Sequence, residues 1–500
     1  MLRAGIARCS ITPPIGMTMA GYAARDGVAE DKDGELYATS LILESEQTRI
    51  AIVAFDLLFI QEPLVSSLRR LIGQRIHVPQ SNVLLNFSHT HCGPTSEGLR
   101  YDDDERHNLL RQAYSERLRT EIPALADLAV HRLAPARVGA SRGEARIGIN
   151  RRERQDDGSV MLGENPLGLV DHEVSVLRID DVRGKPIAVV FAHGCHTVTM
   201  GPKCLCWSAD YVGPARDLIE QSTGGLSLFL QANAGDVNPI TGIGAIEDNS
   251  NEKKRLGIIL GAEVLKVYSS IYTESLRGSR TLIGSLSKIP YYPRVNIEKE
   301  PRYPIAVSEE TLELSLQDFP DRVVADALFN KWDSEVATLV HDNVGGPPLN
   351  VARIFRRWAT VLRKAISDGL KPAVKIPIQA LRVGDIAVIG VPGETFSRQG
   401  MDVKRGSPFP HTLFLGYSNG CVSYIPTPDA YPEQGWSVTD RYYVPDMIFQ
   451  AYLLPTALSP DCGERIVKKS INSLQRLYGQ NAGGSRLVEM ERAIGRPEMS

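Results

Sequence analysis

Short apolar runs of strand length recur along the chain and end in polar loops that contain Gly or Pro. The first two lie between Leu36 and Ser66, are separated by a polar Glu-Gln-Thr turn, and precede a helix expected to end near Gly73. Apolar runs of this length, bounded by turn residues, are typical of buried β-strands. Because helical patterns fall between the strands, we predict an α/β fold with mixed central sheets flanked by helices.

Four further strands are predicted, and each of them runs into polar residues. Their sequences are NVLLNFSHTHCGP, PIAVVFAHGCHT, LSLFLQANAGDVNP and DIAVIGVPGE. In open α/β sheets, ligands collect at the ends of strands. The chemistry of the protein is therefore expected at these four strand ends.

Two longer helices are predicted in the second half of the chain. Residues 251–271 carry apolar side chains three and four positions apart, which gives that helix one apolar face. The helix at 351–368 carries a basic cluster, which we interpret as a solvated face without function; its residues are Arg353, Arg356, Arg357, Arg363 and Lys364.

The domain organisation is predicted from composition and periodicity. Residues 288–350 are rich in Pro, Tyr and acidic residues and show weak periodicity, so we interpret them as an inserted subdomain or lid rather than sheet core. Residues 1–287 and 351–485 then form a single domain. The polar residues 486–500 are expected to be a flexible tail.

Composition narrows the class of protein. The chain of 500 residues is 43% hydrophobic and 23% charged, and its formal net charge of −3 gives no basic excess for binding nucleic acid. No secretory signal follows Arg3, and no apolar run reaches the ~18–20 residues of a membrane span. The seven cysteines are scattered and odd in number, which favours reduced thiols. We expect a cytoplasmic protein without integral membrane association.

Two pairs of histidines are candidate metal ligands. His89 and His91 follow a predicted strand, and residues two apart in an extended chain point to the same side. His193 and His196 follow another strand. Zinc sites often combine a close pair with distant ligands, although a lone His-x-His is as often structural. A rival structural zinc site would use the neighbouring cysteines, but buried free thiols explain them better; they are Cys195, Cys204 and Cys206.

Two loops carry further candidate residues, each with an alternative. Asp236 and Asn238 lie in a loop of small residues that suits oxyanion or substrate binding, or else Asp236 caps the next helix. Glu394 follows a Pro-Gly turn, where a carboxylate is either a metal ligand or a charge favoured at a helix N-terminus.

Together these motifs resemble the neutral, non-lysosomal ceramidase family. The shared landmarks, in the same order, are ITPP with AGY, HTHCGP, INR, the HTVTMG run, SAD, NAGDVNP, PGE and GYSNGC followed by PTPDAY. The resemblance implies a ceramidase-like catalytic domain with a zinc ion as cofactor. The ligands that it implies are His89, His196, Glu394 and Tyr431, with Tyr424 as the local rival of Tyr431.

The resemblance also implies roles for residues around the metal. His91 would transfer protons or stabilise the tetrahedral intermediate, and Arg151 would hold the oxyanion or a substrate carbonyl. Asp236 would share the proton transfer and Asn238 would orient the substrate. Where the family has Asp-x-Ser-Pro, this chain has Asn238 in place of the serine, which excludes a serine nucleophile but keeps a water mechanism.

The predicted function is zinc-dependent hydrolysis of an amide bond by a metal-activated water. The chain leaves no room for the C-terminal β-sandwich of ceramidases, so we expect a small or moderately sized N-acyl substrate rather than long-chain ceramide. Two alternatives stay open: an esterase or lactonase with the same metal site, and a binding protein that has lost catalysis.

Overall fold

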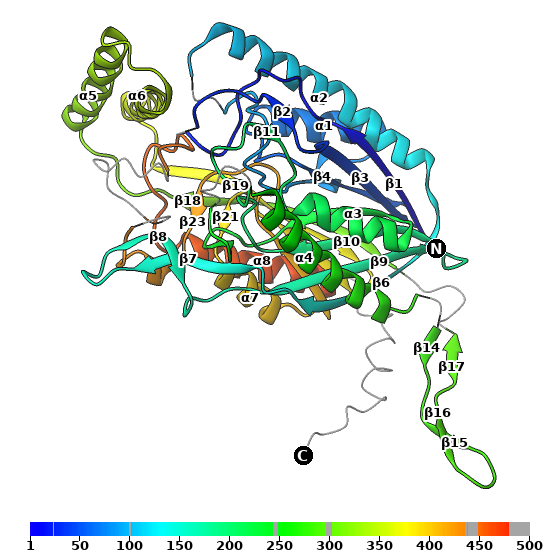
Figure 1. Cartoon of the computed structure of the whole chain (residues 1–500). Helices are drawn as coiled ribbons and strands as arrows, with labels where there is room; N and C mark the ends of the chain where they lie inside the picture. Colours follow the sequence, from blue (N-terminus) through cyan, green and yellow to red (C-terminus); the bar gives the residue numbers. More distant parts are fainter. Residues whose placement is uncertain are drawn as a thin grey trace.

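The structure is a computed structural model that describes residues 1–479, apart from residues 24, 100–101, 244–248, 274, 297–302, 436–437 and 439–448. The tail predicted at 486–500 lies outside the described residues. Two sheets are stacked face to face, with helices on both outer sides (Figure 1). The predicted α/β class with mixed sheets is confirmed.

The first sheet has eight strands and is formed by the N-terminal half. Its strand order is β12 (Leu226–Gln231), β10 (Pro186–His193), β9 (Glu173–Asp181), β6 (Ala134–Glu144), β1 (Leu2–Ser10), β3 (Tyr37–Ser45), β4 (Thr48–Phe55) and β5 (Val83–Phe87). Its outer face is covered by α1 (Leu64–Ile76), α2 (Glu105–His131), α3 (Val212–Thr223) and α4 (Ser250–Ser270).

The second sheet has four strands and belongs to the C-terminal half. Its order is β18 (Ile305–Ser315), β19 (Ala373–Val383), β20 (Ile386–Gly390) and β22 (His411–Leu415). Against it pack α6 (Gly346–Ser367), α7 (Ser397–Gly406) and α8 (Cys462–Gly479), while α5 (Arg322–His341) forms a helical hairpin with α6.

Alternating apolar side chains explain why the sheets stack. In β10, Ala188 and Val190 lie in the core between the two sheets, whereas Val189 and Phe191 face α3 and α4. Neighbouring side chains of a strand point to opposite faces, so a strand that is apolar throughout is buried on both. This burial holds the two halves of the chain together.

The first sheet curls until its two edge strands meet. Asn86 of β5 and Gln231 of β12 lie on opposite edges in strand order, yet the Gln231 N–H donates to Asn86 Oδ1 at 2.7 Å. Asn86 Nδ2 also donates to Gly416 O at 2.9 Å and to Ser418 Oγ at 3.0 Å. This buried amide therefore joins both edges of one sheet to the other half of the chain.

Part of the range predicted as an insertion or lid belongs to a sheet. Ile305–Ser315 forms β18 and pairs with β19 along its whole length. A strand on the edge of a sheet that is half exposed needs less apolar sequence than a central strand, which explains the weak pattern. Whether the rest of 288–350 acts as a lid stays a prediction.

Two further sequence predictions concern the basic cluster and membrane association, and the structure bears on both. The basic cluster on α6 forms ion pairs, for example Arg356 with Asp103 at 2.9 Å and Arg363 with Asp326 at 2.8 Å. Among the described residues, no helix combines the length and apolar character needed to cross a membrane.

Candidate metal centre

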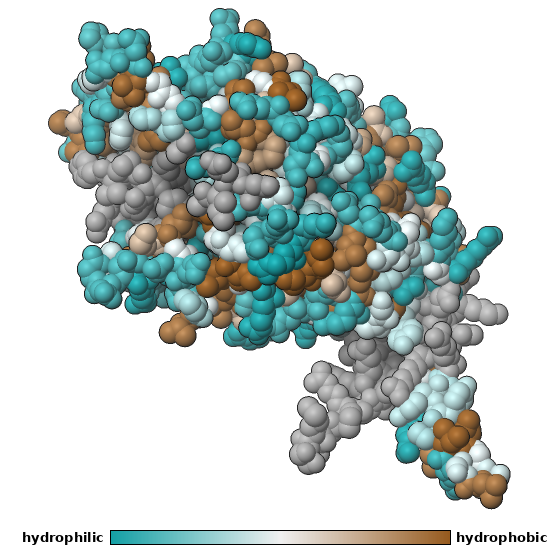
Figure 2. All heavy atoms as spheres, in the orientation of Figure 1, coloured by the Kyte–Doolittle hydropathy of each residue, from teal (hydrophilic) through white to brown (hydrophobic). Residues whose placement is uncertain are grey.

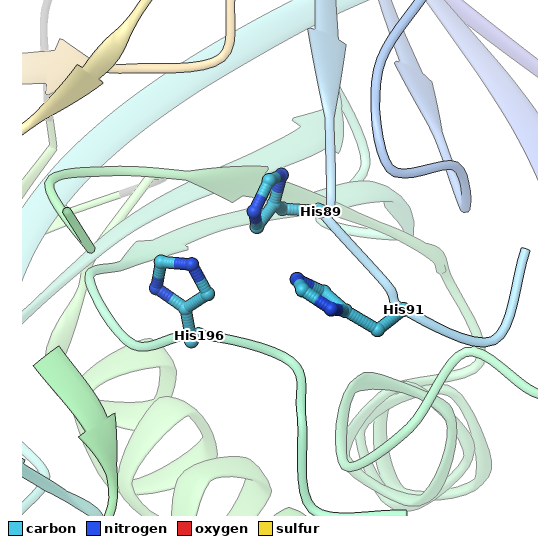
Figure 3. Close-up of side chains that lie close together, drawn as sticks. All are labelled: His89, His91 and His196. Carbon is cyan, nitrogen blue, oxygen red and sulfur yellow. The ribbon is translucent and has the colours of Figure 1, made fainter. Parts of the chain in front are cut away.

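The ends of β5 and β10 bring three imidazole rings together (Figure 3). The ligand atoms of His89, His91 and His196 all lie within 4.8 Å of one another. Glu394 reaches the same place from β21 (Glu394–Thr395), with its Oε2 at 3.3 Å from Nε2 of His196 and 3.7 Å from Nε2 of His89. Its carboxylate is completely buried. Two rings and a carboxylate thus converge on one point.

The protein backbone fixes which nitrogen of each ring is free. His89 Nδ1 lies 3.0 Å from Leu58 O, and His196 Nδ1 lies 2.6 Å from Ala234 O. A carbonyl oxygen only accepts, so Nδ1 carries the proton and Nε2 keeps its lone pair. Within the described part of the chain, the buried Nε2 of His196 has no hydrogen-bond partner. This is the arrangement of metal-ligating histidines.

Burial and neighbouring groups keep the two histidines neutral and Glu394 ionised, which are the protonation states that bind a metal. Burial lowers the pKa of His89 to about 3 and also lowers the pKa of His196, so both rings are neutral at pH 7. For Glu394, burial alone would raise the pKa, but its contacts with His89 and His196 and the permanent charge of Arg151 together hold the pKa below its usual value. The donor set therefore has one negative charge, which suits a divalent cation.

Strained backbone places the histidines. His89 has a φ of 61°, in the left-handed region that residues other than Gly rarely adopt. It is therefore not the extended residue assumed from the His-x-His spacing. A bridge between Thr90 and Thr197 links the two histidine loops, and Thr197 Oγ1 donates to Ser88 O at 2.9 Å. These bonds hold the strained loop in place.

His91 differs from the two other histidines. Both of its ring nitrogens are buried and lack a hydrogen-bond partner among the described residues. The ring packs against Tyr22, with centroids 4.7 Å apart, and a Cβ at Gly21 would overlap it. Gly21, whose φ is +94°, thus makes room for the ring in the AGY motif. No bond fixes the tautomer of His91.

Two tyrosine hydroxyls bond Glu394. Tyr417 donates to Oε2 at 3.3 Å, and Tyr452 donates to Oε1. The hydroxyl of Tyr431, the ligand implied by the resemblance, donates to Leu458 O at 3.0 Å. Sequence reasoning missed both partners of Glu394. Tyr417 lay within the GYSNGC run, whereas Tyr452 lies in no motif that could have pointed to it.

Arg151 of β7 (Gly148–Arg154) is buried beside this cluster and contacts two other segments, residues 235–238 and β23 (Tyr424–Ile425). Its Nη2 donates to Gly235 O at 2.8 Å and to the hydroxyl of Tyr424 at 3.0 Å, and its Nη1 donates to Asn238 Oδ1 at 3.3 Å. Burial lowers the pKa of Arg151, but Tyr424 and Glu394 outweigh burial and raise it. A permanent positive charge therefore lies next to the site.

The Asp236 carboxylate contacts the first residue of a helix from a distant part of the chain. Its Oδ1 accepts from the backbone N–H of Ser397 at 2.8 Å and from the Ser397 hydroxyl at 2.9 Å, at the N-terminus of α7. Burial raises its pKa to about 6 even though these hydrogen bonds lower it. The helix that Asp236 contacts is therefore α7, 161 residues further along the chain, and not the next helix in the sequence, α4, as one interpretation had it. Substrate binding by this loop and proton transfer by Asp236 stay predictions.

The rival cysteine site is not formed. Cys204 and Cys206 are bonded to each other in a disulfide, which corrects the prediction of reduced thiols for this pair; the two cysteines are separated by one residue on a tight loop. Cys195 is a buried free thiol. His193 directs Nδ1 to Glu173 O at 3.0 Å and is not part of the histidine cluster.

Comparison with known proteins agrees with the motifs. Residues 2–255 match the family model described as neutral/alkaline non-lysosomal ceramidase, N-terminal. A neutral ceramidase of Pseudomonas aeruginosa is 23% identical over 89% of this chain and 69% of its own length. Neutral ceramidase B of Dictyostelium discoideum is 23% identical over 76% of this chain, which spans 60% of that protein.

Solved structures are similar in fold. The crystal structure of neutral ceramidase from Pseudomonas aeruginosa superposes with a TM-score of 0.62 at 18% identity, covering 95% of this chain and 75% of the other. A ceramidase complexed with C2 gives a TM-score of 0.63 at 17% identity over the same shares. At this identity the likeness shows the fold alone.

Proposed function

Because this chain belongs to the neutral/alkaline non-lysosomal ceramidase family, a family of amide-bond hydrolases, we propose that it is a zinc-dependent hydrolase of N-acyl compounds. The substrate in this proposal is of small or moderate size. One observation carries the proposal: Nε2 of His89, Nε2 of His196 and Oε2 of Glu394 converge in a buried site, with both rings oriented by backbone carbonyls.

The donor set fits zinc. Two imidazoles and one carboxylate are common ligands of catalytic zinc sites, which keep one position open. We assign the role of the site tyrosine to Tyr452 rather than to Tyr431. The Tyr452 hydroxyl donates a hydrogen bond to Glu394, whereas the Tyr431 hydroxyl donates to Leu458 O. A zinc ion in this site would supply a water molecule of lowered pKa, near 7, and polarise the scissile carbonyl.

Three neighbouring residues would transfer protons, stabilise charge and orient the substrate. His91 lies beside the two ligand histidines without a fixed tautomer, which suits a group that accepts and then returns a proton. Arg151 would stabilise negative charge that develops on the carbonyl oxygen, because its guanidinium is buried and cannot lose its charge. Asn238 contacts this guanidinium and would orient it and the substrate.

Metal content tests the proposal. We expect about one zinc per purified wild-type chain, and strongly reduced zinc in His89→Ala, His196→Ala and Glu394→Ala, by elemental analysis. His193→Ala is the matched control, because His193 is also buried after β10 but lies outside the cluster. Zinc retained in all three variants, or lost equally in the control, would contradict the site.

A substrate panel tests the reaction. Purified protein would be assayed on N-acyl sphingosines of short and long acyl chain, on simple N-acyl amines, and on matched esters and lactones. We expect release of the amine from amides, with short acyl chains cleaved fastest. Turnover of esters or lactones alone would replace the amidase assignment. Bound zinc without any turnover would indicate a binding protein.

A further inference from the structure

A two-stranded ribbon projects from the body of the molecule (Figure 1). It consists of β14 (Ser275–Arg277) paired with β17 (Arg294–Asn296), followed by β15 (Thr281–Ile283) paired with β16 (Ile289–Tyr291). We call residues 275–296 the arm. Neither the catalytic proposal nor the family motifs account for it.

The outer end of the arm is apolar on both faces and at its tip. Leu286, at the turn, is fully exposed, and Ile289 is 58% exposed. Leu282 pairs with Pro290 on one face of the ribbon, and Ile283 pairs with Ile289 on the other. Figure 2 shows hydrophobic side chains exposed on the outer part of the arm. Clusters of exposed apolar residues mark interaction sites.

A ribbon of this kind requires a partner. Two strands alone are marginally stable in water, and their outer edges present unpaired N–H and C=O groups. A lipid surface would cover the apolar tip, but it would offer the two outer edges no strand to pair with. A protein surface can cover both apolar faces and bond the edges. The geometry of the arm therefore favours a protein.

Charge identifies the kind of protein surface. The arm has four basic residues and no acidic residue, in a chain whose net charge is −3, so the rest of the chain carries −7. The two basic side chains described on the arm, Arg280 and Lys288, are exposed. A second copy of this chain thus offers a negatively charged body to a positively charged arm.

The same chain contains a groove that matches the arm. A cavity of about 540 Å³ lies between α7 and α8. Val467 and Ile471 of α8 form apolar walls, and three carboxylates with two basic side chains surround them; the carboxylates are Asp402, Asp429 and Glu464 and the bases Arg398 and Lys468. Arg398 pairs with Asp429 at 3.5 Å, which leaves the rim net acidic.

We propose that the arm of one copy docks into the α7–α8 groove of a second copy and that the protein is a dimer. Leu286 and Ile289 then bury their side chains against Val467 and Ile471, and Lys288 lies near Glu464. Reciprocal exchange of two identical arms gives a closed, symmetric assembly. This association does not depend on the catalytic proposal.

The mass of the full-length protein in solution tests this inference. By sedimentation velocity at micromolar concentration, we expect twice the chain mass of 54.9 kDa for the wild type. Leu286→Asp removes one large apolar contact from each of the two arms, so it should weaken the dimer about 10²- to 10⁴-fold. Leu167→Asp is the matched control, because Leu167 is 97% exposed in a different turn.

Charge reversal tests the groove. We expect Lys288→Glu and Glu464→Lys each to weaken the dimer, and the double variant to recover part of the loss. Circular dichroism and the melting temperature check that each variant is folded. A monomeric wild type, an unchanged dimer in Leu286→Asp, or Glu464→Lys without effect would overturn the proposal. Monomers that float with phosphatidylglycerol vesicles through Leu286 would assign the arm to lipid instead.

Discussion

The two sheets approach the candidate metal centre from opposite sides of one core, and they contribute different chemistry. The half with the eight-stranded sheet contributes His89 and His196, candidate ligands whose tautomers are fixed by backbone carbonyls of the same half. The half with the four-stranded sheet contributes Glu394 together with the hydroxyls of Tyr417 and Tyr452 that bond it. The neutral ligands thus come from one half of the chain and the negative charge from the other.

This difference shows that neither half holds a complete site. The family match ends at residue 255, so it includes the histidines and Arg151 but not Glu394. Asn86 joins the halves close to the site through its bonds to Gln231 and Gly416. Docking of the two sheets therefore brings the proposed ligands together. Four experiments test how the two halves contribute to the site.

The largest effect is expected from removing the metal that would bridge the halves. Zinc at 1,000 times its dissociation constant should stabilise the wild type by about 4 kcal/mol, because it binds the folded state only. Chelation should remove this stabilisation in the wild type and change nothing in Glu394→Ala. Unfolding monitored by calorimetry with and without chelator measures both. Equal zinc stabilisation in the variant would show that the N-terminal half binds the metal alone.

Arg151→Lys should lower kcat about 10²- to 10³-fold while zinc content stays at the wild-type level. Lysine keeps the charge but cannot reproduce the guanidinium geometry that contacts Gly235 and Tyr424. Steady-state kinetics beside elemental analysis provide the measurement. A rise in KM with unchanged kcat would instead assign Arg151 to substrate binding in the ground state.

Asp236→Asn should change how stability depends on pH. The pKa of Asp236 is raised from 3.8 to about 6 by burial, so the folded state binds its proton more tightly than the unfolded state does. Wild-type stability should therefore fall by up to about 3 kcal/mol as pH rises from about 4 to about 6. The amide variant should lack this fall. Urea unfolding across this pH range tests it, and parallel profiles would refute the assignment.

The smallest effect distinguishes two tyrosines of the C-terminal half. Tyr452→Phe should lower kcat/KM or zinc affinity about 10-fold or more, the loss typical of a group that supports a metal ligand. Tyr431→Phe should have little effect on either, because its hydroxyl bonds Leu458 O. The reverse result would restore Tyr431 as the site tyrosine.

Much of the fold was predictable because it depends on local pattern. The strands that became β4, β5, β10, β12 and β20 are apolar runs bounded by turn residues, and α4 has an apolar face with helical spacing. Less was predictable where tertiary pairing decides. The strand β18 is half exposed along its length, so its sequence pattern is weak and its place in a sheet depends on β19. The bond between Cys204 and Cys206 follows from loop geometry.

The local sequence pattern places chemically active residues at the strand ends, since His89, His196 and Glu394 each follow an apolar run. The sequence also determined the order of motifs that marks the family. Only the tertiary structure decided which tyrosine hydroxyls bond Glu394, which ring nitrogens are free, and that Asp236 caps α7. These features depend on contacts between segments far apart in the chain, and spacing along the sequence carries no information about such distances.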